Sequence, residues 1–145
     1  MNSDQLNKCL RSELSAVETY QQAVEKDRQK FGHEIEFQTL VTILTDHQEA
    51  ASQLEAQMQA LAETPVHDSG AWGEWAKLVM GAAKLVGDKA ALKALKEGEE
   101  TGLKEYQELR LDTTMVPRLA AGLIDNLVAH QKTHIRALDG LIARL

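Results

Sequence analysis

Two glutamates and three histidines lie on the apolar faces of segments with helical periodicity, and side chains of these types bind metal ions. Glu13 and Glu99 fall in the first and third segments, His47 in the second, and His130 and His134 in the fourth. The i, i+4 spacing of the last two places both on one helix face. Carboxylate oxygens combined with imidazole nitrogens suit iron, zinc or manganese. We therefore predict that these five residues form a metal site in the middle of a helical bundle.

Each of the two glutamates is followed seven positions later by a tyrosine. The stretch SELSAVETY contains Glu13 and Tyr20, and GEETGLKEY contains Glu99 and Tyr106. Seven residues are about two helical turns, so each tyrosine shares a face with its glutamate. We predict that Tyr20 and Tyr106 line the cofactor site and hydrogen-bond to groups behind the metal ligands.

A metal-free interpretation of the same residues remains open. A buried glutamate without a partner either loses hydration energy or shifts its pKa and becomes neutral. The two glutamates and the histidines would then pair with one another in a buried polar network that fixes the helix register. The remaining candidate acids fall off the apolar faces, and we expect them in solvent: Glu18, Glu49, Glu100 and Glu105.

Four long runs of apolar residues at helical spacing must position these side chains. We expect helical hairpins at about 2–63 and about 89–145, each antiparallel because few residues join its two helices. Pro65 is expected to end the second helix, and Pro117 to lie in the first turn of the fourth. Helices of matched length then bring the candidate ligands to one level of the bundle.

The stretch 65–88 joins the two hairpins and contains an amphipathic segment with Trp72 and Trp75. We predict a short amphipathic helix that crosses the bundle, so that 1–145 forms one all-α domain, an up-down four-helix bundle of two antiparallel hairpins. A long crossover between hairpins is typical of ferritin-like bundles. The two tryptophans favour an alternative function, in which the bundle binds no metal and acts as a structural or protein-interaction module.

Composition restricts the other functions. The chain has 145 residues, 4% aromatic residues and a net charge of −6, without a cluster of Lys and Arg that would favour nucleic acid. We expect no membrane span, because no stretch is long and apolar enough. The start, MNSDQLNKCL, lacks a signal-peptide core, and the single cysteine, Cys9, fits a reducing cytoplasm. No hydrolase motif or phosphate-binding loop is present, and flat helix faces leave a homodimer open.

The sequence resembles the ferritin-like superfamily through its repeated Glu-x6-Tyr element on the first and third helices. GEETGLKEY, SGAWGEWAKL and DHQEAASQLEA also resemble a bacterial ferritin-like family catalogued mainly as a domain of unknown function, and the resemblance covers nearly the whole chain. The resemblance implies that Glu13 and Glu99 are terminal ligands of a di-iron site, with Tyr20 and Tyr106 beside them.

The resemblance also implies a Glu-x-x-His motif on the second and fourth helices, and the chain departs from this pattern. In QKTH, His134 matches the histidine, but Gln131 stands where the bridging glutamate is expected. In HQEA, His47 replaces the glutamate and Ala50 the histidine. Without bridging carboxylates, the site has enough negative charge for one divalent ion but little for two. We therefore predict a degenerate di-iron-type site, and a weak ferroxidase-type activity is the enzymatic function that this pattern leaves open.

Overall fold

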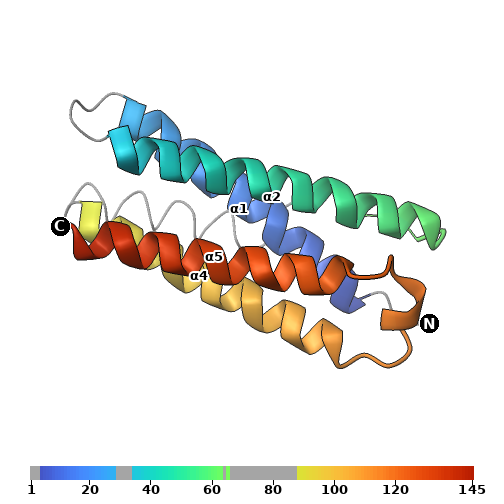
Figure 1. Cartoon of the computed structure of the whole chain (residues 1–145). Helices are drawn as coiled ribbons and strands as arrows, with labels where there is room; N and C mark the ends of the chain where they lie inside the picture. Colours follow the sequence, from blue (N-terminus) through green and yellow to red (C-terminus); the bar gives the residue numbers. More distant parts are fainter. Residues whose placement is uncertain (1–3, 29–33, 64, 66–87) are drawn as a thin grey trace.

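The structure is a computed structural model that describes residues 4–28, 34–63, 65 and 88–145, and its regular elements there are helices. The elements are α1 (Asp4–Arg28), α2 (Glu34–Ala60), α4 (Asp88–Arg110), the short 3-10 helix η1 (Val116–Arg118) and α5 (Leu123–Ala143) (Figure 1). The prediction of an all-α four-helix bundle is thereby confirmed. The predicted crossover helix with Trp72 and Trp75 lies outside the described residues.

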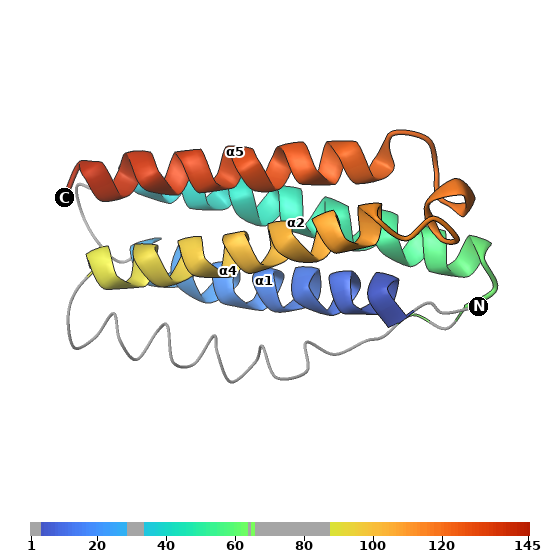
Figure 2. The ribbon, with the colours of Figure 1, turned by 90° about the horizontal axis from the view of Figure 1, so that it is seen from below.

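The helices pack as two antiparallel hairpins. α1 packs against α2 and α4 packs against α5, while α1–α4 and α2–α5 contacts join the hairpins. Figures 1 and 2 show that α1 and α4 run in opposite directions, as do α2 and α5. The start of α1 and the C-terminus therefore lie at opposite ends of the bundle (Figure 1). This arrangement brings the middles of all four helices to one level.

The end of α2 does not depend on Pro65, contrary to the sequence prediction. The helix ends at Ala60, and Ala62 takes the left-handed conformation with φ 59°. The Ala62 N–H donates to the Gln59 carbonyl over 3.0 Å, and the Glu63 N–H donates to the Met58 carbonyl over 2.9 Å. This is the Schellman pattern, which satisfies the last carbonyl groups of a helix.

The start of α5 also differs from the sequence prediction, since Pro117 does not lie in its first turn. Pro117 lies in the separate 3-10 helix η1, after which Leu119 is extended with ψ 158°. Gly122, with φ 79°, then precedes the first residue of α5, Leu123. The extended residue and the left-handed glycine break the helical path between the proline and α5, so the proline cannot belong to that helix.

The apolar core consists of two clusters, one toward each end of the bundle. The cluster that includes the start of α1 contains Leu6, Leu10, Leu54, Met58, Leu109 and Leu127, among others. The other cluster contains Val24, Leu40, Ile43, Leu92, Leu95 and Leu138, among others.

 Between the two clusters lies a layer of four buried ionisable side chains, each no more than 3% exposed: Glu13, His47, Glu99 and His134. The bundle is therefore apolar toward both ends and polar in the middle.

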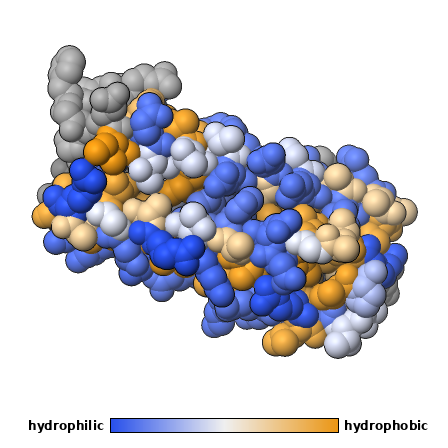
Figure 3. Space-filling model, viewed as in Figure 1, coloured by the Kyte–Doolittle hydropathy of each residue, from blue (hydrophilic) through white to orange (hydrophobic). Residues whose placement is uncertain are grey.

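The surface is of mixed polarity. On the face seen in Figure 1, hydrophilic side chains cover much of α2 and α5, with hydrophobic ones interspersed among them (Figure 3). Over the part of the chain that the structure describes, no helix is both long and apolar enough to cross a membrane.

Gly122, just before α5, and Gly140, inside α5, should change the stability of the bundle in opposite directions when each is replaced by alanine. Gly122→Ala places a Cβ at φ 79° and should lower the free energy of unfolding by about 1–2 kcal/mol. Gly140 is exposed inside α5, and a Cβ there meets no atom within 4 Å. Gly140→Ala should therefore raise the free energy of unfolding by about 0.5–1 kcal/mol. Urea unfolding followed by circular dichroism measures both, and changes of the same sign would contradict this account of the start of α5.

Candidate metal centre

His47 lies at the centre of the polar layer, between two buried carboxylates. Its Nδ1 lies 2.5 Å from Glu13 Oε2, and its Nε2 lies 2.7 Å from Glu99 Oε1. Helix α1 supplies Glu13, α2 supplies His47 and α4 supplies Glu99. An ionised carboxylate only accepts hydrogen bonds, so both ring nitrogens carry a proton when His47 bridges the pair. We refer to these three residues as the Glu13–His47–Glu99 triad.

The charges in the triad determine its protonation. Burial of the His47 ring by itself lowers its pKa, but the charges of Glu99 and Glu13 and the hydrogen bonds to them raise the pKa well above 6.5. Burial likewise raises the pKa of Glu99, but the charge of His47 and the contacts with His134 and His47 lower it to about 2. In the metal-free protein at neutral pH, His47 is therefore a cation that offsets part of the negative charge around it.

The tyrosine of each Glu-x6-Tyr element forms a hydrogen bond with the glutamate of the other element. Tyr20 donates a hydrogen bond to Glu99 Oε1 over 2.8 Å, and Tyr106 donates one to Glu13 Oε1 over 2.5 Å. Each tyrosine of one helix thus holds the glutamate of the other, which is possible because α1 and α4 are antiparallel. Burial and the acceptor carboxylates raise the pKa of both phenols well above 10, so both remain donors.

His134 approaches Glu99 from α5. Its Nε2 lies 2.8 Å from Asp46 Oδ2, so we assign the proton to Nε2 and the lone pair to Nδ1. Nδ1 lies 3.3 Å from Glu99 Oε1. Neither His134 Nδ1 nor Glu99 Oε2 has a hydrogen-bond partner among the residues that the structure describes, although both atoms are buried. Among the described residues, these two buried polar atoms thus remain without a hydrogen-bond partner.

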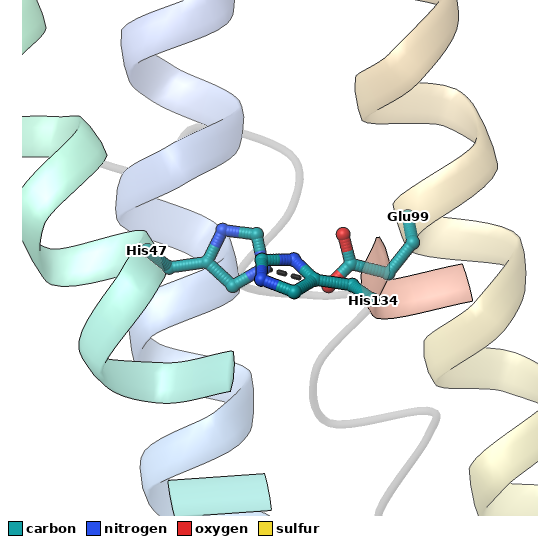
Figure 4. Close-up of side chains that lie close together, drawn as sticks. All are labelled: His47, Glu99 and His134. Atoms are coloured by element: carbon teal, nitrogen blue, oxygen red, sulfur yellow. Dashed lines mark hydrogen bonds and ion pairs between the residues drawn. The ribbon is translucent and has the colours of Figure 1, made fainter. Parts of the chain in front are cut away.

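Three of these side chains converge closely enough to share one ion. His47, Glu99 and His134 each bring a ligand atom to within 4.8 Å of the others. Figure 4 shows the three side chains converging from α2, α4 and α5. Metal–ligand bonds to nitrogen and oxygen are about 2.0–2.2 Å long, so ligand atoms at the upper end of these separations would have to move slightly closer to share an ion.

The backbone of α4 is held against α5 by an amide. Gln131 donates from Nε2 to the Glu99 carbonyl oxygen over 3.0 Å, and its side chain is buried. A Cβ on Gly102 would lie 2.5 Å from the same Nε2. The glycine therefore leaves the space in which Gln131 fixes the position of Glu99.

Four of the five predicted ligands come together, and His130 does not. His130 is exposed, and its ring centroid lies 6.4 Å from that of His134. The expectation that His130 faces inward is wrong, because α5 turns residues 127, 128, 131 and 134 toward the bundle and residue 130 away from it. Glu13 is in the cluster but contacts His47 Nδ1, whereas Glu99 contacts His47 Nε2.

Asp46 was not a sequence candidate. It lies next to His47 but on the side of α2 that meets α5, and the sequence gives no signal for this contact with His134.

A family model described as a domain of unknown function, DUF2383, matches residues 1–111. The chain belongs to this family. The match includes Glu13, His47 and Glu99, whereas His134 on α5 lies beyond it. No curated protein and no solved structure matches the chain. The resemblance to the ferritin-like superfamily stays a prediction.

In this DUF2383 protein, the position of Glu105 also differs from the sequence prediction. Glu105 was predicted in solvent, but it is 4% exposed, and the Ser12 hydroxyl lies 2.8 Å from both of its carboxylate oxygens. Burial raises the pKa of Glu105. Glu18, Glu49 and Glu100 are exposed, as predicted.

Cys9, the single cysteine, is buried. Burial, followed by the charges of Glu105 and Glu13, raises the pKa of its thiol. The thiol is therefore protonated and is not a nucleophile.

Removing either phenol should destabilise the bundle. Tyr106→Phe takes a donor from Glu13 and Tyr20→Phe takes one from Glu99, so each should lower the free energy of unfolding by about 1.5–3 kcal/mol, the range for hydrogen bonds to charged groups. Urea unfolding of the metal-free protein measures this loss. A change within about 0.5 kcal/mol, which is typical of exposed positions, would show that the crossed pairs contribute little.

Proposed function

We propose that this protein binds one divalent metal ion, iron, zinc or manganese, through His47 Nε2, a carboxylate oxygen of Glu99 and His134 Nδ1. The observation that carries the proposal is a pair of buried polar atoms, His134 Nδ1 and Glu99 Oε2, that have no hydrogen-bond partner among the described residues. Leaving such an atom unpaired costs about 1–3 kcal/mol, and a cation that accepts the lone pair of His134 Nδ1 removes this cost there.

The contacts around the three ligands support the proposal. Asp46 holds the Nε2–H of His134, and Glu13 accepts from the Nδ1–H of His47. A carboxylate behind each imidazole selects the tautomer whose other nitrogen is free for metal, and it makes that nitrogen a better ligand. Tyr20 holds Glu99 Oε1 from a third direction.

The charges favour one ion. Bound metal takes the place of the proton on His47 Nε2, which leaves His47 neutral while Glu13, Glu99 and Asp46 stay anionic. A divalent ion then offsets most of this negative charge. Over the described part of the chain, His47, Glu99 and His134 form the one group of ligand-type side chains that converges in this way. Two nitrogens and a carboxylate are a donor set that suits iron, zinc and manganese.

A metal-free structural role is the second candidate, and the Glu13–His47–Glu99 triad favours it. Both nitrogens of His47 are paired with carboxylates, and both glutamates accept from a tyrosine. This network is complete around His47 without an ion. It leaves His134 Nδ1 unexplained, and for this reason we prefer the metal site.

Metal content per chain tests the proposal. Untagged protein offered iron, zinc and manganese should hold about one ion by elemental analysis, and His134→Ala and Glu99→Gln should hold none. His130→Ala is the matched control, because it removes an exposed histidine from the same helix, and it should bind as the parent does. Stoichiometric binding by His134→Ala, or none by the parent, would contradict the proposed site.

Glu13 should act on the ion through His47 rather than as a ligand. Glu13→Gln keeps an acceptor oxygen near His47 Nδ1 but removes its charge, so metal affinity should fall by about 10–100-fold without being lost. Competition with a chelator of known affinity measures the change. Complete loss of the ion would instead identify Glu13 as a direct ligand.

Metal binding should release a proton from His47. The pKa of His47 is raised well above 6.5, so at neutral pH the ion must displace the proton on Nε2. The binding constant should therefore rise about tenfold per pH unit until the pH reaches that pKa. Calorimetric titration in buffers of different ionisation enthalpy counts the released protons. An affinity that does not change between pH 6 and 8, after correction for metal hydrolysis, would show that the ion does not replace this proton.

A further inference from the structure

A cavity lies between α1 and α4 beside the candidate metal centre. Its volume is about 30 Å³, which holds one or two water molecules. Small residues make room for it, among them Ala16 on α1 and Gly98 and Gly102 on α4. His47 and Glu99 line the cavity. It therefore reaches two of the three proposed ligands.

We propose that this cavity is the exchangeable ligand position of the metal site and that it takes a small neutral hydrogen-bond donor, which is water in the resting protein. The inference rests on the proposed function. Three protein ligands leave at least one coordination position of a divalent ion open. His134 closes the site from α5 and is absent from the cavity lining, so the open position faces α1 and α4.

The polar atoms of the cavity wall select a donor. The hydroxyl protons of Tyr20 and Tyr106 are already given to Glu99 and Glu13. Glu99 Oε2 is buried and has no partner among the described residues, and it is an acceptor. An occupant that donates to Glu99 Oε2 while it coordinates the ion satisfies this atom, and water does both.

The charges around the cavity exclude anions. With a divalent ion bound, the three carboxylates Glu13, Glu99 and Asp46 still leave the site with a net negative charge. Glu13 and Glu99 both line the cavity, so an anion that enters it meets two carboxylates at close range. A neutral ligand avoids this repulsion, which is strong in a buried site of low dielectric constant.

Manganese-loaded protein provides the test, because a water molecule that exchanges on Mn²⁺ accelerates the relaxation of bulk water protons. Three proteins are compared at equal bound manganese: the parent, Ala16→Leu and Ala137→Leu. Ala16→Leu fills the cavity, whereas Ala137 is a partly buried alanine on α5 that does not line it. We expect strong acceleration in the parent and in Ala137→Leu, loss of it in Ala16→Leu, and no effect of added azide.

Each outcome decides between the two proposals. A parent that binds no manganese overturns the metal site and this inference with it. Bound manganese without water relaxation in the parent, equal relaxation in Ala16→Leu, or displacement of the water by azide overturns the inference and leaves the metal site standing. Where Ala16→Leu does not fold or bind manganese, Ala16→Val repeats the test with a smaller side chain. Loss of manganese from both folded variants also overturns the inference, because filling the water position should spare the ligands.

Discussion

The burial of two carboxylates around one imidazole is the constraint on which the rest of the bundle depends. Glu13 and Glu99 come from different hairpins, and His47 reaches both over 2.5 and 2.7 Å. Breaking one contact would leave a buried charge without a partner, which is strongly destabilising. The two hairpins are therefore fixed in one register, to which the crossed tyrosine hydrogen bonds add two further links. The apolar clusters on either side supply burial, but such contacts tolerate sliding better than these charged pairs do.

The proposal of a metal site follows from an asymmetry in this arrangement. Glu13 and Glu99 are related by the sequence repeat, yet both use His47, and nothing equivalent happens at His134. Asp46 takes the Nε2–H of His134, so its Nδ1 is left beside a carboxylate that already accepts from Tyr20 and His47. A symmetric pairing of two histidines with two glutamates would satisfy every nitrogen. The unequal pairing leaves His134 Nδ1 without a partner among the described residues, and this is the feature on which the proposed metal site rests.

Helical periodicity was sufficient to predict the hairpins and the burial of Glu13, His47, Glu99 and His134. It failed for His130 because an apolar stripe drifts gradually around a straight helix, so periodicity alone does not decide between neighbouring positions. In α5 the inward position is residue 131 and not residue 130. It failed for Glu105 because the helix α1 supplies Ser12 as a partner, and this contact depends on tertiary packing. The role of Asp46 depends on the approach of α2 to α5, which a pattern within one helix does not contain. Single-helix patterns therefore predicted which faces are inward, and the contacts between helices decided the chemistry.

In the proposed metal site, a proton and a metal ion are alternative occupants of the same position beside His47 Nε2. Without metal, the proton on His47 Nε2 offsets the charge of Glu99, and the triad is complete. In the proposed metal-bound state, the ion would take over this compensation and also use the lone pair of His134. Small metal domains that lack a core unfold without their ion. Here two apolar clusters support the fold in either state, and a protonated His47 adds to them in the metal-free state. At the proposed site a proton would therefore exchange for a metal ion without unfolding of the bundle, which is the property expected of a site that binds its ion reversibly.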